Sequence, residues 1–210
     1  QQTPPTLLGD IGGGALYLVI GILSGLLRVK ETGEGSVVDA AIVDGSAHLM
    51  NLWMSMQETG SVEMKRGQSL LDGPHWSRCY ICSDGKYISV QCLEPKFYSI
   101  FLETLGINKD PLFQSQHEKD QWRAQTDYLS KIFKKKPQAY WVNRFSDLDA
   151  CVAPILDPEE AESDPHMKSR KIWARENGYL MASPAPRFDN NKPKTLQPEA
   201  IIDKKDIVST

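Results

Sequence analysis

The sequence predicts a chain of mixed helix and strand, and three observations lead to this fold class. A glycine-rich motif at residues 9–14 precedes an apolar run with the small residues of a closely packed helix. Turn signals at residues 83–85 and 177–178 separate short β-prone runs, which predicts two hairpins. Hydrophobic residues make up 40% and charged residues 24% of the 210 residues, as in ordinary globular chains.

The N-terminal part is predicted to fold as helix, strand and helix. Residues 15–30 form the first helix, and Gly33 is expected to end it, because glycine tolerates the left-handed conformation of a C-cap. Residues 36–39 are expected to form a short strand and residues 41–58 a second helix, before a polar connection at 59–69. These few elements cannot cover one another's apolar faces, so further protein is expected to bury them.

A compact unit of helices and strands is predicted to follow. Residues 78–82 and 86–92 form a hairpin, and Pro95 opens a helix that Gly106 closes. The remaining predicted elements are, in order, a charged helix at 119–134, a helix at 137–145, a strand at 150–154, a helix that starts after Asp157, and a hairpin of residues 171–176 and 179–183 before a polar tail.

Composition excludes several classes of protein. The net charge of −3 gives no electrostatic footprint for nucleic acid. The apolar run at residues 15–27 is interrupted by Gly21 and Gly25, so it is interpreted as too short to span a bilayer. Four cysteines are ordinary intracellular usage. We therefore expect an intracellular, soluble protein without nucleic-acid or membrane partners, whether cytoplasmic, mitochondrial or peroxisomal. Because residue 1 is not Met and no signal segment follows, the chain is interpreted as a fragment.

Asp10 is the first candidate for chemistry. It precedes three glycines at the start of an apolar helix, where Asp is a preferred N-cap and glycine permits a tight turn. A functional interpretation is compatible with this structural one. Because Gly12, Gly13 and Gly14 lack side chains, a ligand could approach the backbone, and free N–H groups at a helix start could stabilise an oxyanion. Asp10 could then act as acid, base or nucleophile.

Glu94 and His75 are two further candidates. Glu94 lies between a predicted strand and a helix start, where α/β proteins place site residues, although a surface loop residue is the alternative. His75 stands in a turn before the first hairpin and is the histidine whose setting suggests a ligand loop. His48 reads as a packed helix residue. The other two histidines, His117 and His166, read as surface residues.

The cysteines do not predict a metal or redox site. Cys79 and Cys82 are three residues apart on a predicted strand, so their thiols should point to opposite faces. No second pair of ligands follows at the spacing of a zinc site. Cys92 and Cys151 lie in apolar strands and are expected to be buried thiols.

Several strings, taken in order, resemble the CaiB/BaiF-like superfamily of family III CoA-transferases and α-methylacyl-CoA racemases. The resemblance covers nearly the whole chain, and its later strings resemble the racemase branch. The strings are Gly-Asp-Ile-Gly-Gly-Gly at 9–14, Gly-Glu-Gly-Ser-Val-Val-Asp-Ala at 33–40, Leu-Asp-Gly at 71–73, Ser-Asp-Gly-Lys-Tyr at 83–87, Glu-Pro-Lys-Phe at 94–97, Asp-Ala-Cys-Val-Ala-Pro at 149–154 and Ser-Pro-Ala-Pro-Arg-Phe at 183–188.

This resemblance implies an α/β fold with a Rossmann-like large domain and a smaller α+β domain in an interlocked homodimer. Residues 1–60 would be the C-terminal part of the large, CoA-binding domain, and residues 61–72 the linker. Residues 73–170 would form the small domain, and residues 171–210 a return segment and tail.

The resemblance also implies roles for the candidate residues. Asp10 occupies the position of the family's catalytic aspartate, and Glu94 matches a racemase glutamate at the edge of the active site. The implied partner is an acyl-CoA substrate, with CoA as part of the substrate and no separate cofactor or metal.

The implied reaction is racemisation at the α-carbon of a 2-methylacyl-CoA thioester through an enolate. Residues 93–95, Leu-Glu-Pro, stand where the transferases tend to carry an Asn-Asp pair, which favours the racemase. Two alternatives stay open: a CoA-transferase that uses Asp10 as nucleophile, and a non-catalytic fragment that only dimerises.

Three departures from the racemase pattern bear on activity. The racemase histidine lies upstream of the aspartate, and no histidine of this chain matches its position. Thr6 stands where racemases often have Asn, and the loop at residues 73–77 is one residue shorter than usual. The chain alone is therefore expected not to racemise a substrate.

Overall fold

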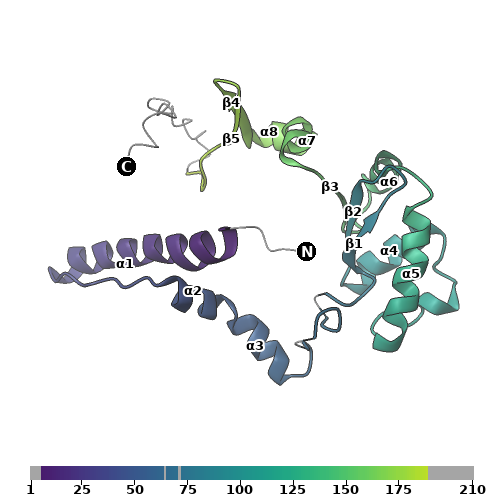
Figure 1. Cartoon of the computed structure of the whole chain (residues 1–210), viewed down its shortest axis with the longest axis horizontal. Coiled ribbons are helices and arrows are strands. Elements are labelled where there is room, and N and C mark those ends of the chain that lie inside the picture. Colours follow the sequence, from purple (N-terminus) through teal and green to yellow (C-terminus); the bar gives the residue numbers. More distant parts are fainter. Residues whose placement is uncertain (1–5, 64, 71, 189–210) are drawn as a thin grey trace, which may run out of the picture.

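The structure is a computed structural model that describes residues 6–63, 65–70 and 72–188 (Figure 1). Its N-terminal part is helical. A nine-residue π-helix, η1 (Leu7–Ala15), runs directly into α1 (Leu16–Thr32), and α2 (Ile42–Leu49) and α3 (Asn51–Glu58) follow. Figure 1 shows α1 and α2 side by side, and a hydrogen bond of 2.7 Å between Tyr17 Oη and His48 Nδ1 links them.

Two predicted elements of this part need correction, and one predicted helix end is confirmed. Gly33 ends α1 with φ 76°, and its N–H donates to the carbonyl oxygen of Val29, as predicted. The strand predicted at residues 36–39 is wrong, because this segment pairs with no strand among the described residues. The single helix predicted at 41–58 is two helices, because the chain tightens at Met50, whose N–H donates to the Ala47 carbonyl.

The first helix is longer than the sequence predicts. Together η1 and α1 span 26 residues, Leu7–Thr32, with a mean hydropathy of 1.7 in an 18-residue window that is 11% buried. The helix extends beyond the apolar run at both ends and is long and apolar enough to cross a membrane by length and composition, so the length of the run alone does not exclude a span. One such helix is weak support for a membrane span, since the core helix of a soluble protein meets the same criteria.

The surface of α1 remains uncovered within the described part of the chain. None of its residues is buried. Nine of its large apolar side chains are exposed: Leu16, Leu18, Val19, Ile20, Ile22, Leu23, Leu26, Leu27 and Val29. Such an extent of exposed apolar surface marks an interaction face.

The second part is built on a three-stranded antiparallel sheet. Its strands are β1 (Ser77–Ile81), β2 (Tyr87–Gln91) and β3 (Val152–Ile155), in the order β1-β2-β3. The predicted turn between β1 and β2 is confirmed, and Gly85 supplies its positive φ of 80°. Ser89 is paired with Cys79 on one side and with Ala153 on the other, which fixes the register of all three strands.

Helices pack against this sheet and enclose the core (Figure 1). They are α4 (Pro95–Leu105), α5 (Trp122–Phe133) and α6 (Gln138–Phe145), with the 3₁₀ turns η2 (Pro111–Phe113) and η3 (Lys119–Gln121). Aromatic rings dominate the core: Tyr80 stacks on Phe133, and Phe101 stacks on both Phe133 and Phe145. Burial of such large apolar side chains is the main stabilising term of this part.

The C-terminal described elements are short and capped. They are α7 (Pro158–Ser163), α8 (Pro165–Arg170), β4 (Trp173–Glu176) and β5 (Tyr179–Ala182). Asp157 and Glu160 form a capping box at the start of α7. Asn177 and Gly178, with φ 50° and 84°, make the predicted turn between β4 and β5. The predicted polar tail lies mostly outside the described residues.

Candidate functional site

Asp10 lies inside the π-helix rather than in front of a helix. The N-cap position of η1 is Thr6, whose carbonyl accepts from the Ile11 N–H at 3.0 Å. The interpretation of Asp10 as an N-cap is therefore wrong, and helical structure begins well before residue 15, where the first helix is predicted to start. The side chain is exposed, and within the described ranges its carboxylate has no hydrogen-bond or ion-pair partner. π-Helical turns are rare and occur frequently at functional sites, so this backbone is compatible with the candidacy of Asp10.

The three glycines contact a neighbouring helix instead of leaving space for a ligand. A Cβ atom on Gly13 would lie 2.4 Å from the Ser46 hydroxyl oxygen, and one on Gly14 would lie 2.9 Å from Ile42 Cγ1. Gly12 is less crowded, with the Leu7 carbonyl oxygen at 3.3 Å from its Cβ position. Because α2 fills this space, the structure corrects the idea of an open, glycine-lined helix start: Gly13 and Gly14 serve helix packing.

Glu94 occupies the junction between β2 and α4. It is the N-cap residue of α4, and its carbonyl accepts from the Tyr98 N–H at 3.0 Å, but its side chain makes no capping hydrogen bond. The carboxylate is exposed, and its charge contributes to the raised pKa of the nearby Cys151 thiol. Pro95 at the first helical position fixes where the helix begins. Glu94 is therefore an available carboxylate on a well-defined backbone.

One residue that the sequence does not point to holds this junction in place. The Gln116 side-chain amide donates to the carbonyl oxygens of Cys92 at 3.1 Å and Leu93 at 2.9 Å. The backbone carbonyl oxygen of Gln116 accepts from the indole N–H groups of Trp76, at 3.1 Å, and Trp122. These contacts fasten the backbone just before Glu94 to the rest of the core. No local pattern marks Gln116, because its partners are 6 to 40 residues away in sequence.

His75 is a core residue in this structure, which argues against its interpretation as a ligand residue. Its side chain is fully buried, and Nε2 is 2.8 Å from the Tyr98 hydroxyl oxygen. Burial, with smaller contributions from the charges of His117 and Arg78, lowers the pKa of His75 to about 3. A buried neutral imidazole cannot contact a ligand from solution. The turn is a signal of chain reversal here, not of a binding loop.

The other histidines and the cysteines give a mixed result. His48 is exposed, contrary to prediction, whereas His117 and His166 are surface residues as predicted. Cys79 is exposed and Cys82 buried, which confirms that their thiols point to opposite faces. Cys92 is buried as predicted, but Cys151 is exposed and precedes β3 with φ 50°. Among the described residues, no group of three His, Cys, Asp or Glu side chains is placed to hold a metal ion.

The described contacts do not bring Asp10 and Glu94 together. The segment around Asp10 packs on α1 and α2, while Glu94 belongs to the β2–α4 junction in another part of the chain (Figure 1). A single site that uses both carboxylates would need a further element or a second copy of the chain.

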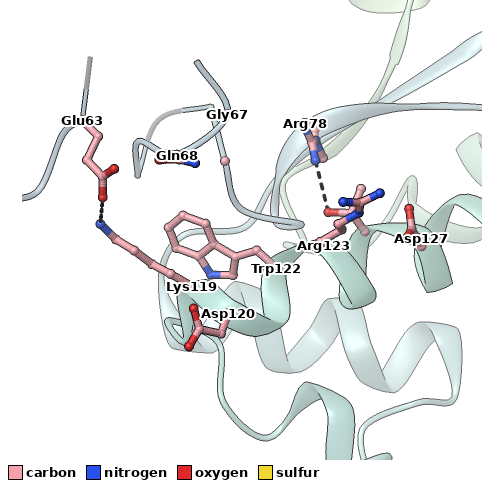
Figure 2. Close-up of a pocket in the computed structure, with 11 residues that line it drawn as sticks. Glu63, Gly67, Gln68, Arg78, Lys119, Asp120, Trp122, Arg123 and Asp127 are labelled. Atoms are coloured by element: carbon pink, nitrogen blue, oxygen red, sulfur yellow. Dashed lines mark hydrogen bonds and ion pairs between the residues drawn. The ribbon is translucent and has the colours of Figure 1, made fainter. Parts of the chain in front are cut away.

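Two cavities lie elsewhere in the described part of the chain. One of about 250 Å³ lies between α1 and α2 and is lined by Tyr17, Gly21, Val38, Asp39, Ala40, Ala41, Asp44, Gly45 and His48. A larger one, of about 520 Å³, lies where the connecting segment meets β1 and the start of α5 (Figure 2). Its lining residues are Glu63, Gly67, Gln68, Gly73, Arg78, Lys119, Asp120, Trp122, Arg123, Thr126 and Asp127. Neither cavity is lined by Asp10 or Glu94.

Sequence comparison finds similarity over almost the whole chain. The model of CoA-transferase family III matches residues 1–199. The α-methylacyl-CoA racemase of Homo sapiens is 36% identical over 190 residues, which cover 89% of this chain and 49% of that protein. The mouse racemase is 35% identical over 185 residues, 87% of this chain and 48% of its own length. The acetyl-CoA:oxalate CoA-transferase of Acetobacter aceti is 26% identical, covering 85% and 48%. The chain spans about half the length of these relatives.

Solved structures show the same fold. The crystal structure of Rv3272 from Mycobacterium tuberculosis matches with a TM-score of 0.66 at 17% identity, over 91% of this chain and 50% of that one. A CaiB/BaiF family protein from Brucella suis matches with a TM-score of 0.63 at 19% identity, over 92% and 52%. These likenesses confirm the predicted α/β fold class.

Proposed function

Because this chain belongs to CoA-transferase family III, we propose that it forms part of an acyl-CoA racemase that inverts the α-carbon of a 2-methylacyl-CoA thioester. The observation that carries this choice is the difference in identity to the two kinds of relative. Two racemases are 35% and 36% identical to the chain, whereas two CoA-transferases are 26% and 25% identical. The family contains both kinds of enzyme, and the α/β fold suits either.

In this proposal Asp10 moves the α-proton at one face of the substrate. The α-proton of a thioester is weakly acidic, so its removal needs a positioned base and stabilisation of the enolate. A carboxylate without a protein partner is free to accept the proton, and Asp10 meets that condition within the described ranges. The acid that works on the opposite face would be the family histidine, which no histidine of this chain matches.

Glu94 is proposed to act at the edge of the same site. Its exposed carboxylate and its fixed place before α4 let it orient or relay a proton without a change in the backbone. Because the described contacts leave Glu94 away from Asp10, the proposal includes a homodimer in which the two carboxylates meet. The exposed apolar face of α1 supports this proposal, because such a face is typical of a surface that contacts another protein chain.

A second candidate function is CoA transfer with Asp10 as nucleophile. Its specific support is the similarity to the acetyl-CoA:oxalate and succinyl-CoA–D-citramalate CoA-transferases. In that reaction the carboxylate would attack the thioester carbonyl and release CoA thiolate, which leaves a mixed anhydride on Asp10. The thiolate would then attack the Asp10 carbonyl carbon, so that the acyl group leaves as a free carboxylate and Asp10 carries CoA as a thioester.

The test is deuterium exchange at the α-carbon of 2-methylacyl-CoA in D₂O, made with the full-length protein that contains this chain. We expect exchange and racemisation by the unmodified protein. Asp10→Asn should lower kcat by about 10²-fold or more, the usual contribution of a general acid or base. Glu94→Gln should also lower it, whereas Asp147→Asn, a change at an exposed carboxylate elsewhere, should not.

Two results would contradict the racemase. Transfer of CoA to a second acid, with a hydroxylamine-sensitive adduct on Asp10, would establish the transferase instead. If the full-length protein showed no exchange and no transfer, both proposed activities would be excluded and the non-catalytic alternative would be favoured.

A further inference from the structure

The cavity of about 520 Å³ contains a half-buried arginine with spare hydrogen-bond donors. Arg78 projects from β1 toward α5, and its Nη1 donates to the Thr126 hydroxyl oxygen at 3.2 Å (Figure 2). In the described part of the chain no carboxylate lies within 4.0 Å of it. A guanidinium group has five N–H donors, so most of its donors remain available to a ligand.

A second arginine lines the same end of the cavity. Arg123 projects from the first turn of α5, and Figure 2 shows it near Arg78, with Asp127 beyond it. Arg123 also has no ion pair among the residues that the structure describes. Two guanidinium groups that share a cavity repel each other unless an anion lies between them, and each can bind an oxyanion through a planar pair of donors.

The remaining charges of the cavity are arranged differently. At the opposite end, Lys119 Nζ lies 2.8 Å from Glu63 Oε1, so this cation is already neutralised (Figure 2). Asp120 and Asp127 also line the cavity. Asp127 is one helical turn after Arg123, and the two side chains form no ion pair. Because residues at this spacing are neighbours on a helix, the Asp127 carboxylate would compete with a bound anion for the Arg123 guanidinium.

We propose that this cavity binds a small oxyanion, a carboxylate or a phosphate group, between Arg78 and Arg123. The bound anion would bridge β1 and α5 in a cavity that Gly67 and Gln68 also line. Arg78 is half-buried, so the interaction is screened by salt less than a surface ion pair would be. The site is separate from Asp10 and Glu94, and it does not depend on the proposed racemase reaction.

The connecting segment gives this site a structural consequence. The Asp72 carboxylate accepts from the N–H groups of Gly67, at 2.7 Å, and Ser69, at 3.1 Å, which folds the segment into a compact loop over the cavity. A Cβ atom on Gly73 would lie 2.8 Å from the Trp122 ring, so the loop approaches the ring closely. An anion in the cavity should therefore protect the amides of residues 65–70 from hydrogen exchange.

The test is a titration of the 210-residue chain with inorganic phosphate and, separately, with succinate, at constant ionic strength set with chloride. The signals are the side-chain Nε–Hε resonances of Arg78 and Arg123 in ¹⁵N-labelled protein. We expect saturable shifts of both resonances. Arg123→Met should raise the dissociation constant by about tenfold, because one charge-assisted pair of hydrogen bonds is lost. Asp127→Asn should lower the dissociation constant severalfold.

Controls separate this site from general charge effects. Lys109→Met removes an exposed cation elsewhere and should leave the dissociation constant unchanged. Arg123 rather than Arg78 is replaced, because Arg123 is exposed on its helix whereas Arg78 is half-buried and its replacement would disturb the core. Tighter binding of phosphate than succinate would indicate a phosphate-bearing ligand, and the reverse order a carboxylic acid. Shifts that do not saturate, that chloride reproduces, or that Arg123→Met leaves unaltered would overturn the proposal.

Discussion

Gly13 and Gly45 bring the backbones of η1 and α2 into direct contact. A Cβ atom on Gly45 would lie 1.8 Å from the Gly13 carbonyl oxygen, a distance at which no side chain fits. Because backbone atoms cannot move aside as a flexible side chain can, only glycine at position 45 permits this approach. The contact fixes α2 against the segment that carries Asp10.

We predict that Gly45→Ala separates η1 from α2. Overpacking at such a contact destabilises a fold by about 1–3 kcal/mol. The measurement is amide hydrogen exchange at residues 12–16 together with urea unfolding, and both should show loss of protection. Gly35→Ala is the matched control, because a Cβ atom there meets nothing within 4 Å and the backbone φ is not positive. Equal protection in both variants would contradict the contact.

Stability should fall with acid because of His75. Its pKa is lowered to about 3 in the folded chain, mainly by burial, and returns to the ordinary 6.5 on unfolding. The unfolded chain therefore binds the additional proton below pH 6.5, so the stabilising contribution is complete above pH 6.5 and is lost as the pH falls toward 3. The measurement is the urea midpoint between pH 7.5 and 4.

Variants distinguish His75 from the carboxyl groups that titrate over part of this range. His75→Gln keeps a polar group beside Tyr98 and should give a shallower loss of stability below pH 6.5. His166→Gln removes an exposed imidazole and should leave the slope unaltered. If the wild-type and His75→Gln slopes coincide, His75 is not buried in its neutral form.

Gln116 offers a third prediction, at the backbone before Glu94. Gln116→Met should leave the carbonyl oxygens of Cys92 and Leu93 without their donors, at a cost of about 1–3 kcal/mol in stability. In the full-length protein it should also lower kcat more than it raises KM, because Glu94 would be held less firmly. Thermal unfolding and steady-state kinetics measure the two effects.

The control is a glutamine two residues away. Gln114 also donates to two carbonyl oxygens, those of Asn108 and Asp110, but it is exposed and lies away from Glu94. Gln114→Met should therefore change kcat little. If Gln114→Met lowered kcat as much as Gln116→Met does, Gln116 would have no particular role at Glu94.

Local chemistry in the sequence was sufficient to predict the second part of the fold. Gly85, Asn177 and Gly178 adopt the positive φ values that their turns require, and Pro95 and Gly106 bound α4. These signals depend on a few neighbouring residues and on backbone preferences. They therefore hold whatever the chain packs against.

The N-terminal part was predicted less well because its conformation depends on distant contacts. The glycines at 12–14 read as a turn that opens a helix, whereas α2 packs against them inside a π-helix. Gly45 within a predicted helix was the signal of a close backbone approach, since glycine is otherwise unfavourable there. The extended residues 36–39 have β-prone side chains but no partner strand among the described residues.

The candidate residues divide in the same way. Asp10 and Glu94 are both accessible carboxylates, and such side chains can be recognised from their neighbours in sequence. His75 could not be assigned in this way, because its environment comes from Tyr98 and Phe113, which are distant in sequence. Arg78 and Arg123 share a cavity only after β1 and α5 have packed.

The four cysteines should fall into two classes of reactivity toward a thiol reagent. Cys79 and Cys151 are exposed, whereas Cys82 and Cys92 are buried. Burial raises the pKa of Cys82 to about 11 and of Cys92 to about 12, so neither forms the reactive thiolate at pH 8. Partial burial and the charges of Asp149 and Glu94 also raise the pKa of Cys151, so an anionic reagent should label it more slowly than Cys79.

Stoichiometric labelling with a chromogenic disulfide reagent measures this pattern, and peptide mass spectrometry assigns the sites. We expect two thiols per chain to react in the native state and four in denaturant. Replacing Cys79 and Cys151 together by Ser should remove the native reaction, and the Glu94→Gln variant should accelerate labelling of Cys151 because it removes a nearby negative charge. Rapid native labelling of Cys92 would contradict the burial of this residue, which directly follows β2. An unchanged rate at Cys151 in Glu94→Gln would instead place that carboxylate too far away to influence the thiol.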